Sequence, residues 1–278
     1  MKHQSNILAL KYRPLNFQDL IGQEYLVETI QKSIQQNKIP NAYIFTGIRG
    51  VGKTTTARIV AKMLNCTVFD KNNNPDLINC EQAKAITEDR HPDVIEIDAA
   101  SNTSVENARE IIENVKYNPV LGKYKVYIVD EVHMLSKSAF NALLKTLEEP
   151  PPHSKFIFAT TEISKVPITI LSRCQRFDLR RVEKKTLSDF LKSIAKKEDI
   201  TISNEALNLI VKASDGSVRD SLSILDQANI FKSQKEIQVE EIVNMLGFAK
   251  QSDLYELSKC ILDNNLSKLI SMLDDMYK

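Results

Sequence analysis

The 278-residue sequence has no tryptophan, only seven glycines and four cysteines, and no long apolar run. Crossing a membrane would need about 18 or more consecutive apolar residues, and the first residues also lack the hydrophobic stretch of a secretory signal. We therefore expect a soluble, cytosolic protein. The cysteines stand far apart, which predicts free thiols rather than a disulfide framework. The scarcity of glycine and the absence of tryptophan fit a helix-rich chain.

An excess of charge of either sign is lacking as well. The chain has 37 basic and 36 acidic residues, and its formal net charge is +1 at pH 7. This balance excludes the global basic field of an obligate nucleic-acid coat protein, so any contact with DNA must come from a local patch. With 42% hydrophobic residues, the chain is long enough to bury a sizeable core, in two or three domains.

Short apolar runs alternate with helical patterns through the first 180 residues. Four of the runs are typical of strands buried on both faces of a parallel sheet, at residues 42–47, 93–98, 124–130 and 155–161. One helix between them is expected to open with a capping box, with Thr103 as the cap and Glu106 three residues later. The alternation predicts right-handed crossovers and an α/β fold with ligands at the carboxyl ends of the strands.

Beyond residue 182 the strand signals stop and helical patterns take over. These patterns lie at Leu187–Lys197, Asn204–Ser214 and Val218–Phe231. We expect an α/β nucleotide-binding domain at 1–179 and a small helical domain at 180–245. Two further amphipathic helices in 249–278 bury little apolar surface alone, so 246–278 is expected to be the truncated start of a third, helical domain.

Residues 47–54, GIRGVGKT, match the pattern G-x-x-x-x-G-K-[ST] between a predicted strand and a predicted helix. The glycines let the loop wrap so that backbone N–H groups and the helix N-terminus face phosphates. Lys53 would reach the β- and γ-phosphates, and the Thr54 hydroxyl would bind Mg²⁺. A plain glycine-rich turn would leave this lysine without a role. The residues expected to hold the nucleotide here are Gly47, Ile48, Arg49, Gly50, Val51, Gly52, Lys53, Thr54 and Thr55.

The run at 126–130 ends in the acidic pair Asp130 and Glu131. Asp130 would hold Mg²⁺, directly or through water, and Glu131 would orient a water for attack on the γ-phosphate. Acid pairs at strand ends are more often solvated caps, but the phosphate loop reverses that preference. Glu131 favours a hydrolase over a kinase, because hydrolysis needs an activated water. We assign the nearby His133 a supporting role and not that of a base.

Polar and cationic groups follow downstream. Thr160 and Thr161 end the next predicted strand, where a γ-phosphate would lie. Arg173 stands in a Ser-Arg-Cys triplet. Arg219 lies near the N-terminus of a predicted helix, where the helix dipole disfavours a cation, so we expect it to meet an anion.

Taken in order, these blocks resemble the gamma/tau subunits of bacterial DNA polymerase III, the AAA+ ATPase motors of the sliding-clamp loader. The matching blocks are residues 8–24, 47–54, 95–110, 125–151, 156–182 and 216–228. The resemblance implies a P-loop NTPase domain with a parallel five-stranded sheet, a helical lid and the start of a helical collar domain.

The resemblance also implies roles for single residues. The adenine and ribose would be bordered by Ala9, Tyr12, Arg13, Pro14, Ile21 and Gly22. Thr161 matches the first sensor of the γ-phosphate and Arg219 the second, in the lid. Arg173 matches the arginine finger that reaches the ATP of a neighbouring subunit. Such a finger contributes about 10³ to 10⁵ in rate, so the isolated chain is expected to be a poor ATPase.

Implied partners are the delta and delta-prime clamp-loader subunits, other gamma/tau copies, the sliding clamp and primed DNA. We expect the chain alone to be a monomer, since little of the collar is present. The helix beginning near Ser101 is the implied DNA contact, although this chain has Asn102 and Ser104 where some relatives carry basic residues. Lys145 is a further candidate, with a solvated helix-face lysine as the alternative.

Zinc is the clearest departure from the family. Relatives often carry four cysteines after the first helix of the domain, whereas this chain has only Cys66 and Cys80 there. Two thiolates cannot close a tetrahedral site, so we expect no zinc and a polar loop at 70–78. Cys174 and Cys260 are assigned to packing.

The sequence therefore predicts an ATP- and Mg²⁺-dependent motor subunit that loads the sliding clamp onto primed DNA, with no polymerase active site in this chain. One alternative is a scaffold or stator subunit of the same complex that does not hydrolyse ATP. Intact Lys53, Thr54, Asp130 and Glu131 argue against it, because a scaffold need not keep all four. A related AAA+ helicase or remodeller is disfavoured by the Ser-Arg-Cys and Glu-Glu-Pro-Pro blocks.

Overall fold

The computed structural model describes residues 7–70, 75–101, 105–231, 236–247 and 251–277. Its centre is a parallel sheet of five strands in the order β2-β3-β4-β1-β5. The strands are β1 Ala42–Thr46, β2 Val94–Asp98, β3 Lys125–Asp130, β4 Ser154–Thr160 and β5 Gln175–Asp178. The four strands expected from apolar runs begin and end within one residue of their predicted bounds. The predicted parallel five-stranded sheet is confirmed.

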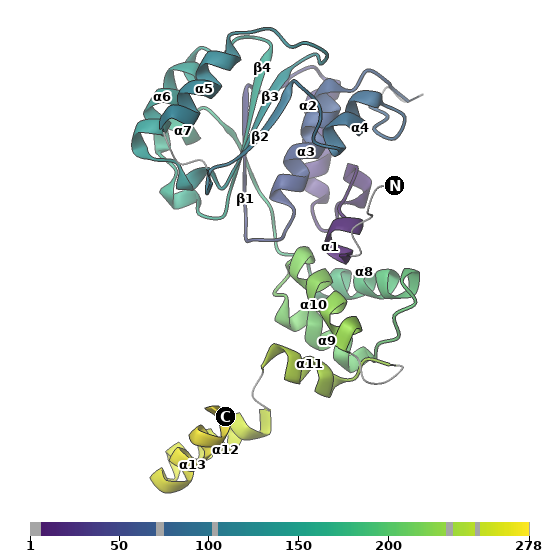
Figure 1. The fold of residues 1–278 in the computed structure, drawn as a ribbon, viewed down its shortest axis with the longest axis vertical. Coiled ribbons are helices and arrows are strands. Elements are labelled where there is room, and N and C mark those ends of the chain that lie inside the picture. The colour runs from purple at the N-terminus through teal and green to yellow at the C-terminus, as the bar shows by residue number, and fades with distance from the viewer. Residues whose placement is uncertain (1–6, 71–74, 102–104, 232–235, 248–250, 278) are drawn as a thin grey trace.

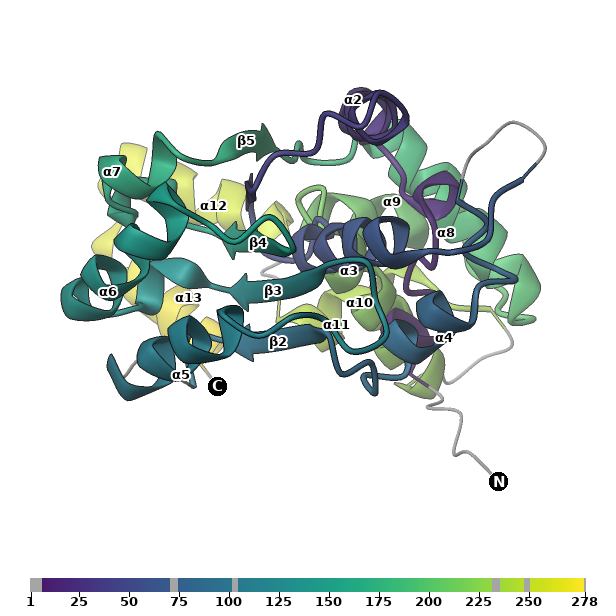
Figure 2. The same cartoon turned by 90° about the horizontal axis from the view of Figure 1, so that it is seen from above.

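Helices cover both faces of the sheet (Figure 1). On one face, Tyr43 and Phe45 of β1 pack with α2 (Glu24–Gln35) and α3 (Lys53–Asn65). On the other face, Ile44 packs with residues of α5 (Val105–Val115), α6 (Lys137–Glu148) and α7 (Ile168–Leu171). Every residue of β1 and β4 is buried, which is why these segments are apolar at consecutive positions. Figure 2 shows β2, β3 and β4 side by side, in the order of the sheet.

Short elements connect the layers. They are α1 Leu8–Lys11, α4 Glu81–Thr87 and the 3₁₀ turns η1 Phe17–Asp19, η2 Val132–Met134 and η3 Ile163–Lys165. The turn η2 follows β3 directly, and η3 follows β4. Because β3 and β4 are neighbours, the segments after them come together at one edge of the sheet.

Four helices follow the sheet and share one core. They are α8 Lys184–Lys197, α9 Asn204–Ala213, α10 Val218–Phe231 and α11 Val239–Leu246. Leu8 of α1 is buried in the same core, so the N-terminal segment packs against this helical unit. The prediction named the first three helices but not α11, whose start carries a capping box formed by Gln238 and Glu241.

The last two helices, α12 Gln251–Leu262 and α13 Leu266–Tyr277, pack against each other at the foot of Figure 1. Leu262 and Tyr255 of α12 are 85% and 75% exposed. The two predicted amphipathic helices are therefore present, while the domain boundaries stay predictions. No helix in the described part of the chain is long and apolar enough to cross a membrane. The expected cap Thr103 lies outside the described residues, as do Asn102, Ser104 and part of the 70–78 loop.

Candidate nucleotide-binding site

The turn between β1 and α3 is built from the predicted phosphate loop. Gly47 and Gly50 have φ of 150° and 79°, in the region that favours glycine. A Cβ on Gly47 would lie 2.7 Å from the carbonyl oxygen of Leu179. A Cβ on Gly50 would lie 2.1 Å from Oγ of Ser217. The loop is therefore closely overlain by the segment after β5 and by the helical unit, and a side chain at either position would push these apart.

Lys53 opens α3 and turns its side chain back into the loop. Its ammonium is buried and donates to the carbonyl oxygens of Gly47 at 3.1 Å and Ile48 at 3.0 Å. Burial lowers the pKa of Lys53, an effect that the nearby carboxylates of Glu131 and Asp130 oppose. A buried cation between a row of glycines and two acids is suited to meet phosphate oxygens.

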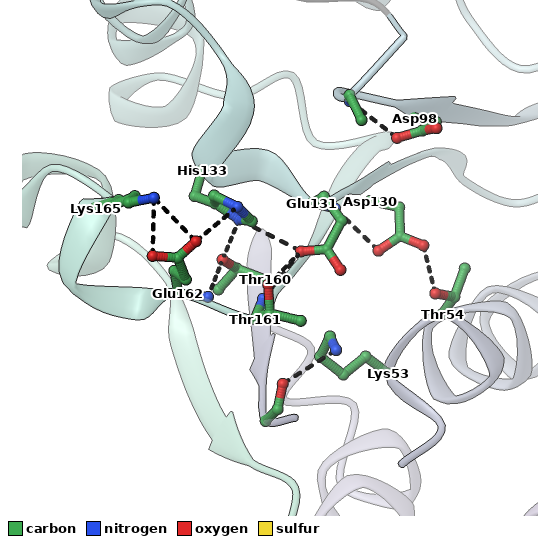
Figure 3. A network of polar contacts seen from close by, with 12 residues as sticks. Lys53, Thr54, Asp98, Asp130, Glu131, His133, Thr160, Thr161, Glu162 and Lys165 are labelled. Atoms are coloured by element: carbon green, nitrogen blue, oxygen red, sulfur yellow. Dashed lines mark hydrogen bonds and ion pairs between the residues drawn. The ribbon is translucent and has the colours of Figure 1, made fainter. Parts of the chain in front are cut away.

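Thr54 and Asp130, the residues predicted to bind Mg²⁺, are in direct contact. The Thr54 hydroxyl donates to Oδ2 of Asp130 across the gap between α3 and the end of β3 (Figure 3). Oδ1 of Asp130 accepts the backbone N–H of Glu131 at 2.9 Å. A hydroxyl and a carboxylate are the hard oxygen donors that Mg²⁺ prefers, so the residues present fit this ion.

Glu131 contacts Thr161, the predicted first sensor. Oε2 of Glu131 accepts the backbone N–H of Thr161 at 3.0 Å and its hydroxyl at 2.9 Å. Glu131 has φ of 46°, a left-handed conformation that is costly for a residue with a side chain. The strained turn after β3 therefore directs this carboxylate toward the end of the neighbouring strand β4, as Figure 3 shows.

Sequence reasoning gave His133 only a supporting role and missed Glu162 and Lys165. Nδ1 of His133 lies 2.9 Å from Oγ1 of Thr160 and 3.3 Å from Oε2 of Glu131. Nε2 lies 3.5 Å from Oε1 of Glu162, whose carboxylate also contacts the Lys165 ammonium at 2.8 Å. The hydrogen bond from Lys165 lowers the pKa of Glu162. No local motif marks these residues, because only the alignment of β3 beside β4 joins them.

The backbone of Arg219, the predicted second sensor, contacts the phosphate loop. Its N–H donates to the carbonyl oxygen of Gly50 at 3.2 Å, and its side chain is exposed. The turn before α10 is held in place because the N–H of Val182 donates to the carbonyl of Gly216 at 3.1 Å. The helical unit thus reaches the loop directly through the first turn of α10.

The segment predicted to border the base lies between α3 and the helical unit. Nε of Arg13 donates to the Thr55 hydroxyl at 3.3 Å, and burial lowers the pKa of this guanidinium. The Tyr12 hydroxyl donates to Glu198, the residue after α8, and this hydrogen bond raises the pKa of Tyr12 to about 12. The other members, Ala9, Pro14, Ile21 and Gly22, lie on the same segment. Their contact with a nucleotide stays a prediction.

The contacts that the structure gives for Arg173 are with α6 and with the segment around α7, and not with the phosphate loop. Its guanidinium donates to Glu148 of α6 at 2.5 Å, to the carbonyl of Thr169 at 2.7 Å and to the Ser172 hydroxyl at 3.2 Å. None of these contacts is with the phosphate loop of the same chain, and the role of Arg173 as a finger stays a prediction. Lys145 is exposed on α6, and its contact with DNA also remains untested.

Cys66 and Cys80 are buried together with Ala83 and Leu77. Burial, and then a hydrogen bond with Cys80, raise the pKa of Cys66 to about 12. Within the described ranges no three His, Cys, Asp or Glu side chains gather where they could hold a metal. Two thiols do not fit a closed tetrahedral site, and zinc binding itself stays untested. Cys174 is half-buried and Cys260 buried, as expected for packing residues.

Comparison with known proteins gives two matching family models and a similar solved structure. A family model described as DNA polymerase III, delta subunit, matches residues 22–183. A second, described as DNA polymerase III clamp loader subunit, ATPase lid domain, matches residues 186–234. Among solved structures, RuvB of Thermotoga maritima aligns with a TM-score of 0.64 at 17% identity, over 95% of this chain and 85% of that one. The solved structure supports the AAA+ fold alone.

The family assignment rests on the similarity of the chain to curated relatives. The tau/gamma subunit of DNA polymerase III from Haemophilus influenzae is 48% identical over 87% of this chain and 35% of its own length. The tau subunit from Bacillus subtilis is 45% identical over 96% of this chain and 47% of its own length, so the chain spans less than half of both proteins. The gamma subunit from Buchnera aphidicola is 43% identical over 98% of this chain and 74% of its own length. The chain therefore belongs to the gamma/tau subunit family of DNA polymerase III.

Proposed function

We propose that the chain is an ATP-hydrolysing motor subunit of the clamp loader of DNA polymerase III, which uses ATP to load the sliding clamp onto primed DNA. The observation that carries the proposal is the convergence of Lys53, Thr54, Asp130 and Glu131 at the ends of β1 and β3. A non-hydrolysing stator would need neither the strained Glu131 backbone nor the contact between Thr54 and Asp130.

Each residue has a distinct part in the proposed reaction. Lys53 and the loop N–H groups bind the β- and γ-phosphates. Thr54 and Asp130 hold Mg²⁺, which neutralises phosphate charge when bound. Glu131 takes a proton from a water whose oxygen attacks the γ-phosphorus, and the bond to the bridging oxygen of ADP breaks. The backbone N–H of Thr161 holds Glu131, and its hydroxyl would turn to the transferred phosphoryl group.

Two arginines connect this reaction with movement and assembly. Arg219 would read the phosphates from the helical lid, whose backbone is already hydrogen-bonded to Gly50. Arg173 would complete the site of a neighbouring copy. The proposed partners are the delta and delta-prime subunits, other copies of this chain, the clamp and primed DNA, in the bacterial cytosol. The isolated 278-residue chain would be a monomer with slow turnover.

Single-turnover ATP hydrolysis by the assembled complex, with and without clamp and primed DNA, tests the proposal. We expect strong stimulation by the pair, and we expect Glu131→Gln to abolish hydrolysis while the variant still binds ATP. An assembly that binds ATP but shows no stimulation would support the stator instead. Hydrolysis that survives Glu131→Gln would remove this residue from the mechanism.

A further inference from the structure

Among the residues that the structure describes, the contacts of the Glu131 carboxylate are made by one of its oxygens, Oε2. Three groups converge on Oε2: the N–H of Thr161 at 3.0 Å, its hydroxyl at 2.9 Å and Nδ1 of His133 at 3.3 Å. In Figure 3, Oε1 points away from His133, toward the side where Lys53 and Thr54 lie. A carboxylate fixed at one oxygen presents the other in a defined direction.

One of these three contacts conflicts with the proposed role of Thr161. A threonine hydroxyl has a single hydrogen to donate, and here it goes to Glu131. If Thr161 turns this hydrogen to a phosphate oxygen, as a sensor would, Oε2 keeps only the Thr161 backbone N–H and the imidazole. His133 is then the one side chain among the three groups that still holds Oε2.

His133 is itself fixed by partners on both sides. Its side chain is only 6% exposed, and Nδ1 lies 2.9 Å from the Thr160 hydroxyl, whose oxygen accepts the Glu162 N–H at 3.0 Å. Nε2 faces the Glu162 carboxylate, which Lys165 holds in turn. Turning the ring would break contacts at both nitrogens. Nδ1 carries at most one hydrogen, and it has two oxygens within reach, Oγ1 of Thr160 at 2.9 Å and Oε2 of Glu131 at 3.3 Å. The contact with Oε2 is attractive only when Nδ1 carries this hydrogen, with the Thr160 oxygen as a second acceptor.

We propose that His133 is a positioning residue for Glu131. Its Nδ1–H holds Oε2, so Oε1 stays directed at the attacking water while the Thr161 hydroxyl turns to the phosphate. This inference rests on the proposed function, in which Glu131 is the base. It assigns His133 no contact with substrate and no part in proton transfer to the water.

Two amide substitutions separate this role from plain packing. The amide nitrogen of asparagine can take the place of Nδ1, and that of glutamine the place of Nε2. His133→Asn therefore keeps a donor for Glu131, whereas His133→Gln keeps one for Glu162. A residue that merely fills space would tolerate both changes, or neither, to a similar degree.

The test is single-turnover hydrolysis by the assembled complex, with binding of a non-hydrolysable ATP analogue and thermal unfolding measured in parallel. We expect His133→Asn to stay within about threefold of the unsubstituted rate and His133→Gln to lose about 10- to 100-fold, as for a misplaced catalytic group. KM for ATP and the analogue affinity should stay within about twofold. His133→Leu, which has the shape of asparagine without a donor, gives the same comparison if the glutamine variant does not fold.

Equal rates for the asparagine variant and either donor-deficient variant would overturn the inference. A loss that appears in KM and not in the rate would overturn it as well. If Glu131→Gln alone leaves hydrolysis intact, the proposed function fails, and this result is distinct from a failure of the His133 substitutions.

Discussion

The backbone N–H of Arg219 donates to the carbonyl oxygen of Gly50 at 3.2 Å, so the first turn of α10 is hydrogen-bonded to the phosphate loop. The same loop position is covered by Ser217, whose hydroxyl also accepts the N–H of Asp220 at 3.2 Å. The lid and the phosphate loop are therefore in direct contact at Gly50, where there is no room for a side chain. A shift of the loop on nucleotide binding would be passed to α10 through this contact.

Replacing Gly50 by alanine should break this contact. The new Cβ would lie 2.1 Å from the Ser217 hydroxyl and 3.2 Å from Cβ of Arg219, and it would adopt a φ of 79°. A left-handed alanine alone costs about 1–2 kcal/mol, and forcing extra volume into a packed contact adds about 1–3 kcal/mol. We expect lower stability in urea unfolding together with weaker binding of ATP.

Gly247→Ala is the matched control. Gly247 follows α11 with φ of 63°, and a Cβ there would meet no atom of the described residues within 4 Å. This variant should lose only the conformational cost, about 1–2 kcal/mol, and keep its ATP affinity. If Gly50→Ala binds ATP as well as Gly247→Ala does, the loop and the lid are not coupled through Gly50.

Local patterns predicted most of the α/β fold. The strand bounds and the phosphate loop follow from consecutive apolar residues and a motif of fixed spacing, and both depend on neighbours in the chain. The fifth strand came only from the family resemblance, because β5 is an edge strand in which only Phe177 is buried. Helix α11 was missed because a glutamine, an unusual cap, begins it.

The contacts within the site were less predictable. The residue types at 54, 130, 131 and 161 were identified, but the bonds from Thr161 to Glu131 and from Thr54 to Asp130 depend on the order of the strands. The contacts of His133 and the approach of Ser217 to Gly50 depend on tertiary packing that no local signal records. The chemistry of the site was predictable from its residue types, whereas the fold determines which side chains are in contact.

Thr54 should be needed for Mg²⁺ but not for the nucleotide itself. Its hydroxyl meets the Asp130 carboxylate, where the ion is proposed to bind. Because loss of a supporting residue already costs metal sites about 10- to 100-fold, we expect Thr54→Ala to weaken Mg²⁺-dependent ATP binding by at least about tenfold. Thr54→Ser keeps the hydroxyl and should bind normally. Titrations with Mg²⁺ and with EDTA check this, since all three proteins should behave alike in EDTA.

Lys62 should make the stability of the fold depend on pH in the alkaline range. Lys62 lies on α3 and is 3% exposed, and its ammonium donates to the carbonyl oxygen of Leu15 at 3.4 Å. Burial, and then the charge of Arg58, lower the pKa of Lys62 to about 8. In the unfolded chain the pKa of a lysine is about 10.4. Between about pH 8 and this value the unfolded chain therefore binds one more proton than the folded chain, and the free energy of unfolding rises with pH. Below about pH 8 both states are charged and the full cost remains.

Lys62→Met should remove this cost. We expect the variant to be more stable by about 1–3 kcal/mol at pH 7, and the gain to shrink as the pH approaches about 10. Urea unfolding at several pH values measures the difference from the unsubstituted chain. Lys192→Met, on the exposed face of α8, is the control and should show no such pH-dependent gain. A gain that is the same at pH 7 and pH 10 would rule out a charge effect at Lys62.

Arg173 should affect turnover without affecting the fold or ATP binding. Its ion pair with Glu148 is partly exposed, the two side chains being 32% and 49% accessible, and such pairs contribute about 0–1 kcal/mol. We therefore expect Arg173→Ala to unfold nearly as the unsubstituted chain does and to bind ATP within about twofold. In the assembled complex its hydrolysis should fall by about 10³- to 10⁵-fold. Arg176→Ala, which removes an exposed partner of Asp178 on β5, should leave both quantities unchanged.

Mixing two defective chains tests whether Arg173 acts on a neighbour. A complex that contains both Arg173→Ala and Glu131→Gln copies has some interfaces where an intact Glu131 faces an intact Arg173. Hydrolysis should reappear at these interfaces, although neither variant hydrolyses ATP when it supplies every copy. If Arg173 acted within its own chain, an Arg173→Ala copy would have no active site, and a Glu131→Gln copy would have none either. A mixture that stays inactive would therefore place the effect of Arg173 inside its own subunit.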